Sequence, residues 1–93
     1  MAGLLCIKCE KFILNSQETK KITLGTGLLV VIASGSQYGA AFLIDYWANK
    51  VNKISSTTGG DNISVTKASQ TKDVSITNLQ NVSSSFYCIF LGQ

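Results

Sequence analysis

The chain has 93 residues, enough for one small domain with a high ratio of surface to interior. Charged residues make up only 14% of it, and the eight cations, all lysine, are scattered among five acids to give a net charge of +3. Because the lysines do not cluster and no arginine accompanies them, the composition argues against nucleic-acid binding. With no histidine there is no ordinary general base and no Ser-His or Cys-His pair, so we expect no enzymatic activity.

The first candidate site along the chain is the Cys6-x-x-Cys9 spacing. A structural zinc site needs about four ligands, and the sequence offers only one more cysteine, Cys88, and no histidine. The residues around the motif are typical of a strand rather than of the helix start of a thioredoxin-like site. We therefore expect no metal and no cofactor, with the cysteines as small buried residues in a reducing compartment. Whether Cys6 or Cys9 pairs with Cys88 stays open. Residues 1–11 lack the features of a signal peptide.

Turn-forming residues divide the chain into eight short segments with strand-like composition. In chain order we place them at 4–14, 19–24, 28–34, 38–47, 51–56, 62–67, 74–78 and 85–91. No segment has the periodicity of an amphipathic helix. The pattern predicts an all-β fold: an antiparallel β-sandwich of about eight strands, jelly-roll-like, formed by a single domain over residues 1–93.

One uncharged stretch, residues 22–44, is long enough to cross a bilayer as a helix. Its centre is polar, with Ser-Gly-Ser-Gln at 34–37, and it contains the β-branched run 30–32, both of which disfavour a membrane helix. We therefore predict two strands joined by a turn at 34–37, and no membrane insertion. A small membrane protein with one helix over 22–44 is the alternative, since Gly35 and Gly39 have the spacing of a transmembrane dimer motif.

Alternation of apolar and polar residues predicts which side chains form the core. It selects one face of segment 86–91 together with Ile22, Leu24, Leu29, Val31, Phe42, Ile44, Ile54, Ile63, Val65, Val74 and Ile76. Segments 86–91, 28–32 and 4–7 are apolar on both faces, although a two-layered domain buries only one of them. We therefore expect a second copy of the chain to cover the other face.

Three aromatic residues lie next to predicted turns: Tyr38, Tyr46 and Trp47. Their rings combine an apolar body with a polar group and suit contact with a sugar or a protein, so we take them as candidate ligand-binding residues. Alternatively, Tyr46 and Trp47 close one end of the core.

The order of the segments adds a resemblance. It consists of Lys-Ile-Thr-Leu at 21–24, Gly-x-Gly before the apolar segment 28–32, segment 38–44 after a polar turn, segment 51–54, the alternating pair 63–66 and 74–78, and a closing segment 86–91 before Gly92. This arrangement resembles the small C-terminal β-sandwich modules of bacteriophage tail fibres and related virion appendages.

The resemblance implies a non-enzymatic phage virion structural protein, at a tail-fibre tip or on the capsid surface, assembled in the bacterial host cytoplasm. It also implies a homo-oligomer, with a trimer favoured, and other virion proteins and a host-surface glycan or protein as partners. A stand-alone, monomeric carbohydrate-binding β-sandwich is the alternative function.

Overall fold

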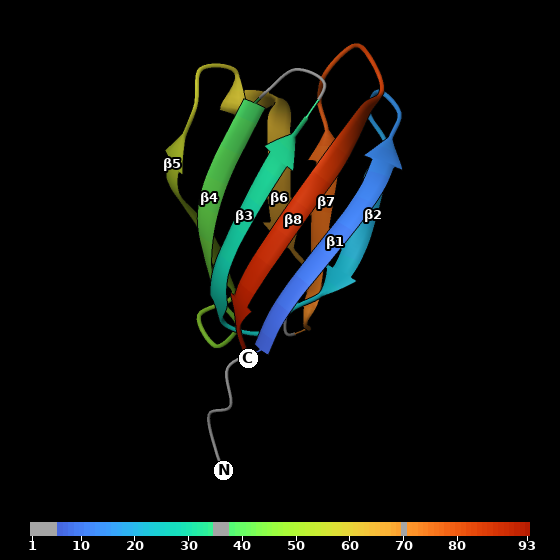
Figure 1. Ribbon diagram of the computed structural model, residues 1–93. Helices are drawn as coiled ribbons and strands as arrows, with labels where there is room; N and C mark the ends of the chain where they lie inside the picture. The colour runs from blue at the N-terminus through green and yellow to red at the C-terminus, as the bar shows by residue number, and fades with distance from the viewer. Residues whose placement is uncertain (1–5, 35–37, 70) are drawn as a thin grey trace.

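The computed structural model, which describes residues 6–34, 38–69 and 71–93, contains two antiparallel sheets packed face to face (Figure 1). The five-stranded sheet has the order β1-β8-β3-β4-β5, and the three-stranded sheet has the order β2-β7-β6. The elements are β1 (Cys6–Leu14), β2 (Thr19–Thr23), β3 (Gly27–Ala33), β4 (Tyr38–Asp45), β5 (Lys50–Ser56), the 3-10 helix η1 (Gly60–Asn62), β6 (Ile63–Lys67), β7 (Asp73–Asn78) and β8 (Ser84–Gly92). The all-β sandwich expected from the sequence is confirmed.

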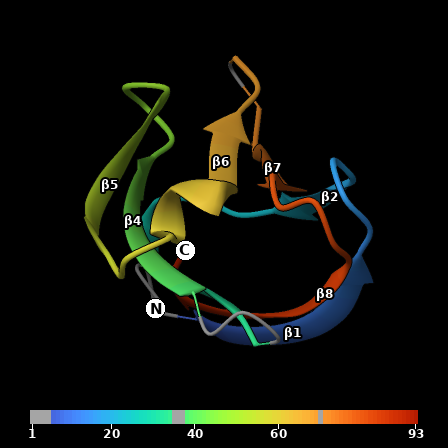
Figure 2. The same ribbon diagram turned by 90° about the horizontal axis from the view of Figure 1, so that it is seen from above.

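The strands are connected in a nested order. The first strand pairs with the last, from Cys6 opposite Gly92 to Leu14 opposite Ser84, while β2 pairs with β7 in the other sheet. This nesting is the jelly-roll-like part of the fold, and β3, β4 and β5 add a simple meander to it. The five-stranded sheet curves around the three-stranded sheet, as Figure 2 shows.

The uncharged stretch 22–44 forms strands. It supplies the end of β2, all of β3 and most of β4, and β3 pairs antiparallel with β4 from Gly27 opposite Ile44 to Ala33 opposite Tyr38. Residues 35–37 of the expected turn lie outside the described residues. No helix in the described part of the chain is long and apolar enough to cross a membrane.

The core lies between the two sheets, where alternate side chains of each strand meet. Phe86 and Phe90 of β8 are its largest fully buried side chains, and Val74 and Ile76 of β7 join it from the other sheet without exposure to solvent. Ten of the eleven core residues named from the sequence are buried, as is the Phe86, Cys88 and Phe90 face of β8. Apolar alternation alone was sufficient to find them.

Ile54 is the exception, and its assignment to the core was wrong. The β4–β5 register shifts between Ala41, which opposes Ser55, and Phe42, which opposes Lys53, so Ile54 has no partner. This β-bulge on an edge strand turns the side chain outward and leaves it 54% exposed.

Asn78, at the end of β7, is a buried polar residue that the sequence did not reveal as such. Its Nδ2 group donates to the carbonyl oxygens of Leu14 at 3.0 Å and Val82 at 2.9 Å, and its Oδ1 accepts the Gln80 N–H at 2.9 Å. These bonds connect the three-stranded sheet to the end of β1 and to the loop before β8. They compensate for burying an amide that is fully excluded from solvent.

Candidate functional site

The outward side of the five-stranded sheet is mostly apolar, although much of it is exposed to solvent. Residues that alternate with the core positions of β1, β8, β3 and β4 project away from the sandwich, and most of them are apolar. We call this surface the outer apolar face and define it as Ile7, Ile13, Leu28, Val30, Ile32, Ala41, Leu43, Tyr87, Ile89 and Leu91. Leu28, Val30 and Ala41 are half-buried, and the exposed fraction of the other seven ranges from 39% at Tyr87 to 71% at Ile7.

Strand register aligns these side chains into rows that cross the sheet. Leu91 lies opposite Ile7 on one side and Leu28 on the other, and Leu28 in turn lies opposite Leu43. The next row places Ile89 between Cys9 and Val30. Directly opposed side chains on one face are within contact distance, so the rows form one continuous apolar surface.

Charge is scarce on this face. Lys11 of β1 lies beside its rows, with its Nζ 5.5 Å from the centroid of the Tyr87 ring, a cation–π distance. Asp45, which lies opposite Lys50, follows Leu43 on the same side of β4 at the margin of the face. Toward β5, the small residues Gly39 and Ala41 leave a shallow hollow of about 410 Å³, which Val30 and Ile32 also line. The surface is therefore apolar and almost uncharged, with one recess at its β4–β5 side.

The outward side of the three-stranded sheet has the opposite character. Its residues are Thr19, Lys21, Thr23, Ser64, Thr66, Asp73, Ser75 and Thr77. The hydroxyls of Thr19 and Thr77 share a hydrogen bond of 2.7 Å across β2 and β7. This is the usual composition of a sheet face in water.

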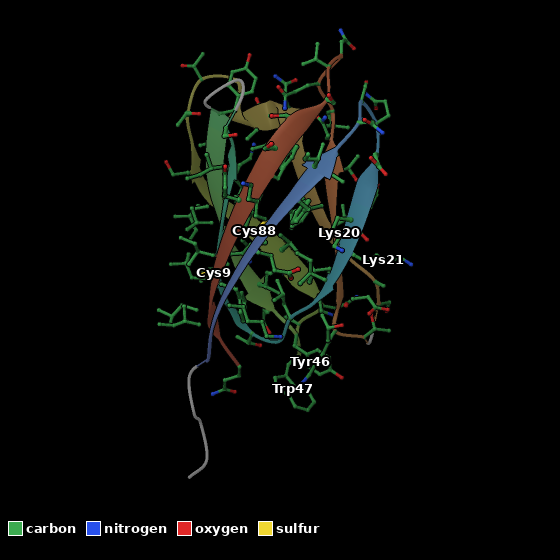
Figure 3. All side chains as sticks on the ribbon, turned by 45° about the vertical axis from the view of Figure 1, so that its right-hand side comes forward. Cys9, Lys20, Lys21, Tyr46, Trp47 and Cys88 are labelled. Atoms are coloured by element: carbon green, nitrogen blue, oxygen red, sulfur yellow. The ribbon has the colours of Figure 1, made fainter. Side chains whose placement is uncertain are left out.

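Tyr46 and Trp47 lie at one end of the sandwich in a tight turn, where Figure 3 labels both. The expected strand 38–47 stops at Asp45, because the Asp45 carboxylate accepts the Ala48 N–H at 3.0 Å and Asn49 adopts a left-handed φ of 57°. The Tyr46 N–H donates to Thr26 Oγ1 at 3.0 Å, which fixes the turn to the segment before β3.

The two rings are arranged edge to face. Their centroids are 5.2 Å apart with an interplanar angle of 83°, and the Nζ of Lys67 lies 4.9 Å from the centroid of the Tyr46 ring. Asn49 Oδ1 accepts a hydrogen bond of 2.7 Å from Lys67, which holds the ammonium group there. Trp47 is 86% exposed, whereas Tyr46 is half-buried.

A pocket of about 340 Å³ opens beside these rings. We call it the end pocket, and its lining residues are Gly25, Thr26, Tyr46, Trp47, Lys72 and Gln93. Backbone hydrogen bonds join its walls, from the Leu24 N–H to the Lys72 carbonyl at 2.9 Å and from the Gln93 N–H to the Thr26 carbonyl at 3.0 Å. The sequence identified the two aromatic residues but missed the other four.

Tyr38, the third candidate, lies far from the other two. It begins β4 and Tyr46 follows the end of this eight-residue strand, so about 25 Å separates them at the usual rise per residue. The half-buried Tyr38 ring covers Gly59, where a Cβ atom would overlap it, and Gly59 has a φ of 87°. Tyr38 thus packs on Gly59 at the opposite end of the molecule from Tyr46 and Trp47, where it also lines the hollow beside Gly39 and Ala41.

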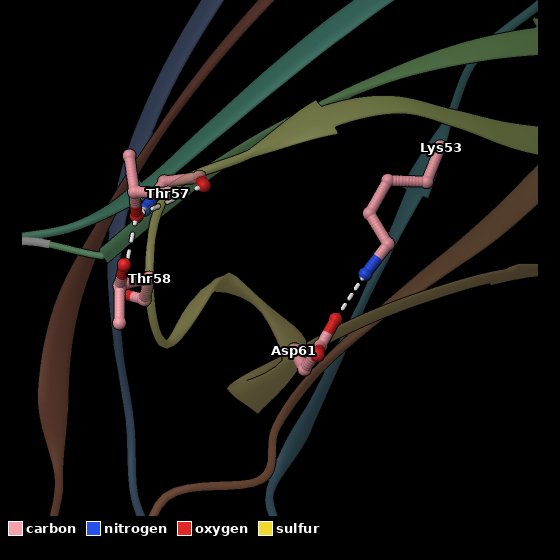
Figure 4. Close-up of polar contacts among 5 residues, drawn as sticks. Lys53, Thr57, Thr58 and Asp61 are labelled. Carbon is pink, nitrogen blue, oxygen red and sulfur yellow. Dashed lines mark hydrogen bonds and ion pairs between the residues drawn. The ribbon is translucent and has the colours of Figure 1, made fainter.

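The turn that includes Gly59 also contains a surface ion pair. The Lys53 ammonium contacts the Asp61 carboxylate, and Thr57 Oγ1 accepts the Gly39 N–H at 2.9 Å and donates to the Thr58 carbonyl at 3.5 Å (Figure 4). The hydrogen bond from Lys53 and its charge lower the pKa of Asp61 below its usual value. Since Asp61 is fully exposed, we assign this pair to the local support of the turn.

The cysteines offer no shared site in the described part of the chain. Cys88 faces the core as expected, but the expectation that Cys9 is buried was wrong, because Cys9 is exposed on the outward side of β1; both are free thiols. Burial, with a smaller contribution from the Glu10 charge, raises the pKa of Cys88 to about 12, which makes it a poor nucleophile. No group of three or more His, Cys, Asp or Glu residues within 6–34, 38–69 and 71–93 is arranged to hold a metal ion.

No protein-family model matches the chain, and neither does any curated protein or solved structure with which it was compared.

Proposed function

We propose that this protein is a non-enzymatic structural module that assembles with copies of itself through the outer apolar face. The observation that supports the proposal is that face itself: aligned rows of Ile, Leu, Val and Tyr on the side of a sheet that the sandwich core does not cover. Exposed apolar surfaces of this kind are typical of interaction sites.

The dimensions of the face suit this role. Four strands spaced about 4.8 Å apart, each about eight residues long with a rise of 3.3 Å per residue, give a surface of roughly 500 Å². That is near the upper end of the largest apolar patches on soluble monomers, which are about 300–600 Å². Copies that cover this face bury roughly 500 Å² each, or about 1,000 Å² for every two copies, which is the minimum for a biological interface and below the standard size of about 1,200–2,000 Å².

A second copy of the chain is the partner that this surface fits best. A nearly uncharged face offers few polar groups for recognising a different, polar protein surface, whereas it matches itself in flatness and in chemistry. In a closed three-fold ring one side of this face packs against the other side of the neighbour's face, so the same residues can serve all three copies. We favour a trimer, in line with the resemblance to phage appendage modules.

The more specific part of the proposal is a bacteriophage virion protein, placed at a tail-fibre tip or on the capsid surface and assembled in the host cytoplasm. Its support is the order of strand and turn motifs that resembles such modules, together with the self-association proposed above. Tail or capsid genes next to the coding gene would agree with it, and a neighbourhood of host metabolic genes would argue against it.

The molar mass in solution tests the self-association. Light scattering over a range of concentrations is expected to give about three times the 10.0 kDa mass of the chain. A mass of one chain at every concentration would contradict the proposal.

A further inference from the structure

We propose that the end pocket binds a pyranose sugar of a glycan, with the indole ring of Trp47 as the surface on which the sugar stacks. The inference concerns Thr26, Tyr46, Trp47 and Lys72, none of which belongs to the outer apolar face. The pocket therefore remains available whether or not that face is covered by other copies.

The exposed indole ring of Trp47 supports a role in ligand contact. The turn that carries it is fixed by hydrogen bonds of Asp45 and Tyr46 and by the backbone of Asn49, and none of these involves the indole. With 86% of Trp47 exposed, the ring also contributes little to the core. A large apolar ring that the fold does not use is suited to contact with a ligand.

Contacts within the fold hold the walls of the site in place. Tyr46 contacts the indole edge to face at 5.2 Å, and Tyr46 is itself held by Thr26 and by the ammonium of Lys67. Backbone bonds at Lys72 and Gln93 fix the walls of the pocket. A preformed site binds without the cost of ordering its loops.

The chemistry of the pocket fits a sugar. A pyranose ring has a face of C–H groups, which packs on an aromatic ring, and hydroxyls around its edge, which need hydrogen-bonding partners. Trp47 supplies the ring, while Thr26, Lys72 and Gln93, which also line the pocket, carry hydrogen-bonding groups. A volume of about 340 Å³ is within the range of about 300–1,000 Å³ of small-molecule sites.

Two other ligand classes fit less well. A cationic ligand would meet Lys72 in the pocket and Lys67 on the Tyr46 ring, so like charges would repel it. Single-stranded nucleic acid requires several stacking rings along a basic groove, whereas this site exposes one indole and the chain contains no arginine.

Trp47 is the single tryptophan of the chain, so its fluorescence reports on this pocket alone. The protein is first screened on a glycan array, and the best oligosaccharide is then titrated into wild type by fluorescence. Trp47→Ala and Trp47→Phe lack the fluorophore, so their binding is compared with that of wild type on the array. We expect saturable changes in wild-type fluorescence. We also expect array binding at least tenfold weaker in Trp47→Ala, and within a few-fold of wild type in Trp47→Phe, since a ring is retained.

Ile89→Glu, which changes the outer apolar face, separates this proposal from self-association. Its affinity for the sugar in the fluorescence titration is expected to equal that of wild type, even if the variant is monomeric. The inference is overturned if wild type binds no sugar, if Trp47→Ala binds as well as wild type in a circular-dichroism-verified fold, or if only an oligonucleotide changes the fluorescence.

Discussion

The two outward faces of the sandwich are built by the same rule and have opposite compositions. On both sheets alternate residues point inward to one shared core, yet the other set is Thr, Ser, Lys and Asp on the three-stranded sheet and Ile, Leu, Val and Tyr on the five-stranded sheet. These outward side chains do not pack in the core. Their composition therefore reflects what lies outside each sheet, which is water on one side and, in our proposal, other copies of the chain on the other.

The largest expected difference in stability is between substitutions on the inner and on the outer side of β8. Phe86 is fully buried and its neighbour Tyr87 is 39% exposed on the outer apolar face. Phe86→Ala should lower the free energy of unfolding by about 3–5 kcal/mol, because it leaves a cavity in the core. Tyr87→Ser should lower it by less than about 1 kcal/mol in a dilute, monomeric sample. Urea denaturation measures both, and equal losses would mean that the outer face stabilises the single chain.

Substitution of Asn78 tests how much its hydrogen bonds contribute to stability. Asn78→Ala should cost about 2–3 kcal/mol in urea denaturation, since it leaves the Leu14 and Val82 carbonyls and the Gln80 N–H without the partner they have now. Asn52→Ala, at an exposed position of β5, is the matched control and should change stability by less than about 0.5 kcal/mol. A neutral Asn78→Ala variant would show that these bonds add nothing to stability.

Cys88 gives a smaller, pH-dependent effect on the inner side. Its pKa is raised to about 12 from an ordinary value of 9.0, so the folded chain keeps a proton that the unfolded chain loses above pH 9. Stability is therefore unaffected by this group below pH 9 and falls as the pH rises from 9 towards 12, by about 1 kcal/mol at pH 10. Cys88→Ala should remove this part of the pH dependence in thermal or urea unfolding. An unchanged slope would contradict the assignment.

The sequence was sufficient for the strands and most of the core, because each depends on local alternation. It did not predict the burial of residues whose position depends on tertiary contacts. The bulge that exposes Ile54 depends on pairing with β4, and Asn78, at the end of the expected strand 74–78, is a polar residue that only long-range bonds show to be buried.

The grouping of Tyr38 with Tyr46 and Trp47 was avoidable. In an antiparallel sandwich each strand reverses direction, so the turns after β2, β4, β6 and β8 share one end, and these carry Thr26, Trp47, Lys72 and Gln93. Tyr38 precedes β4 and must lie at the other end. Counting strands would therefore have placed the residues of the end pocket at one end of the sandwich and Tyr38 at the other.

The most direct test of the account compares one substitution on each outward face. Ile89 lies on β8 in the middle of the outer apolar face, and Ser75 lies on β7, the central strand of the polar face. Sedimentation equilibrium of wild type, Ile89→Glu and Ser75→Glu should give an oligomer for wild type and Ser75→Glu, and a single chain for Ile89→Glu with an unchanged β spectrum. An oligomer that persists in Ile89→Glu, or one that dissociates in Ser75→Glu alone, would contradict the central claim.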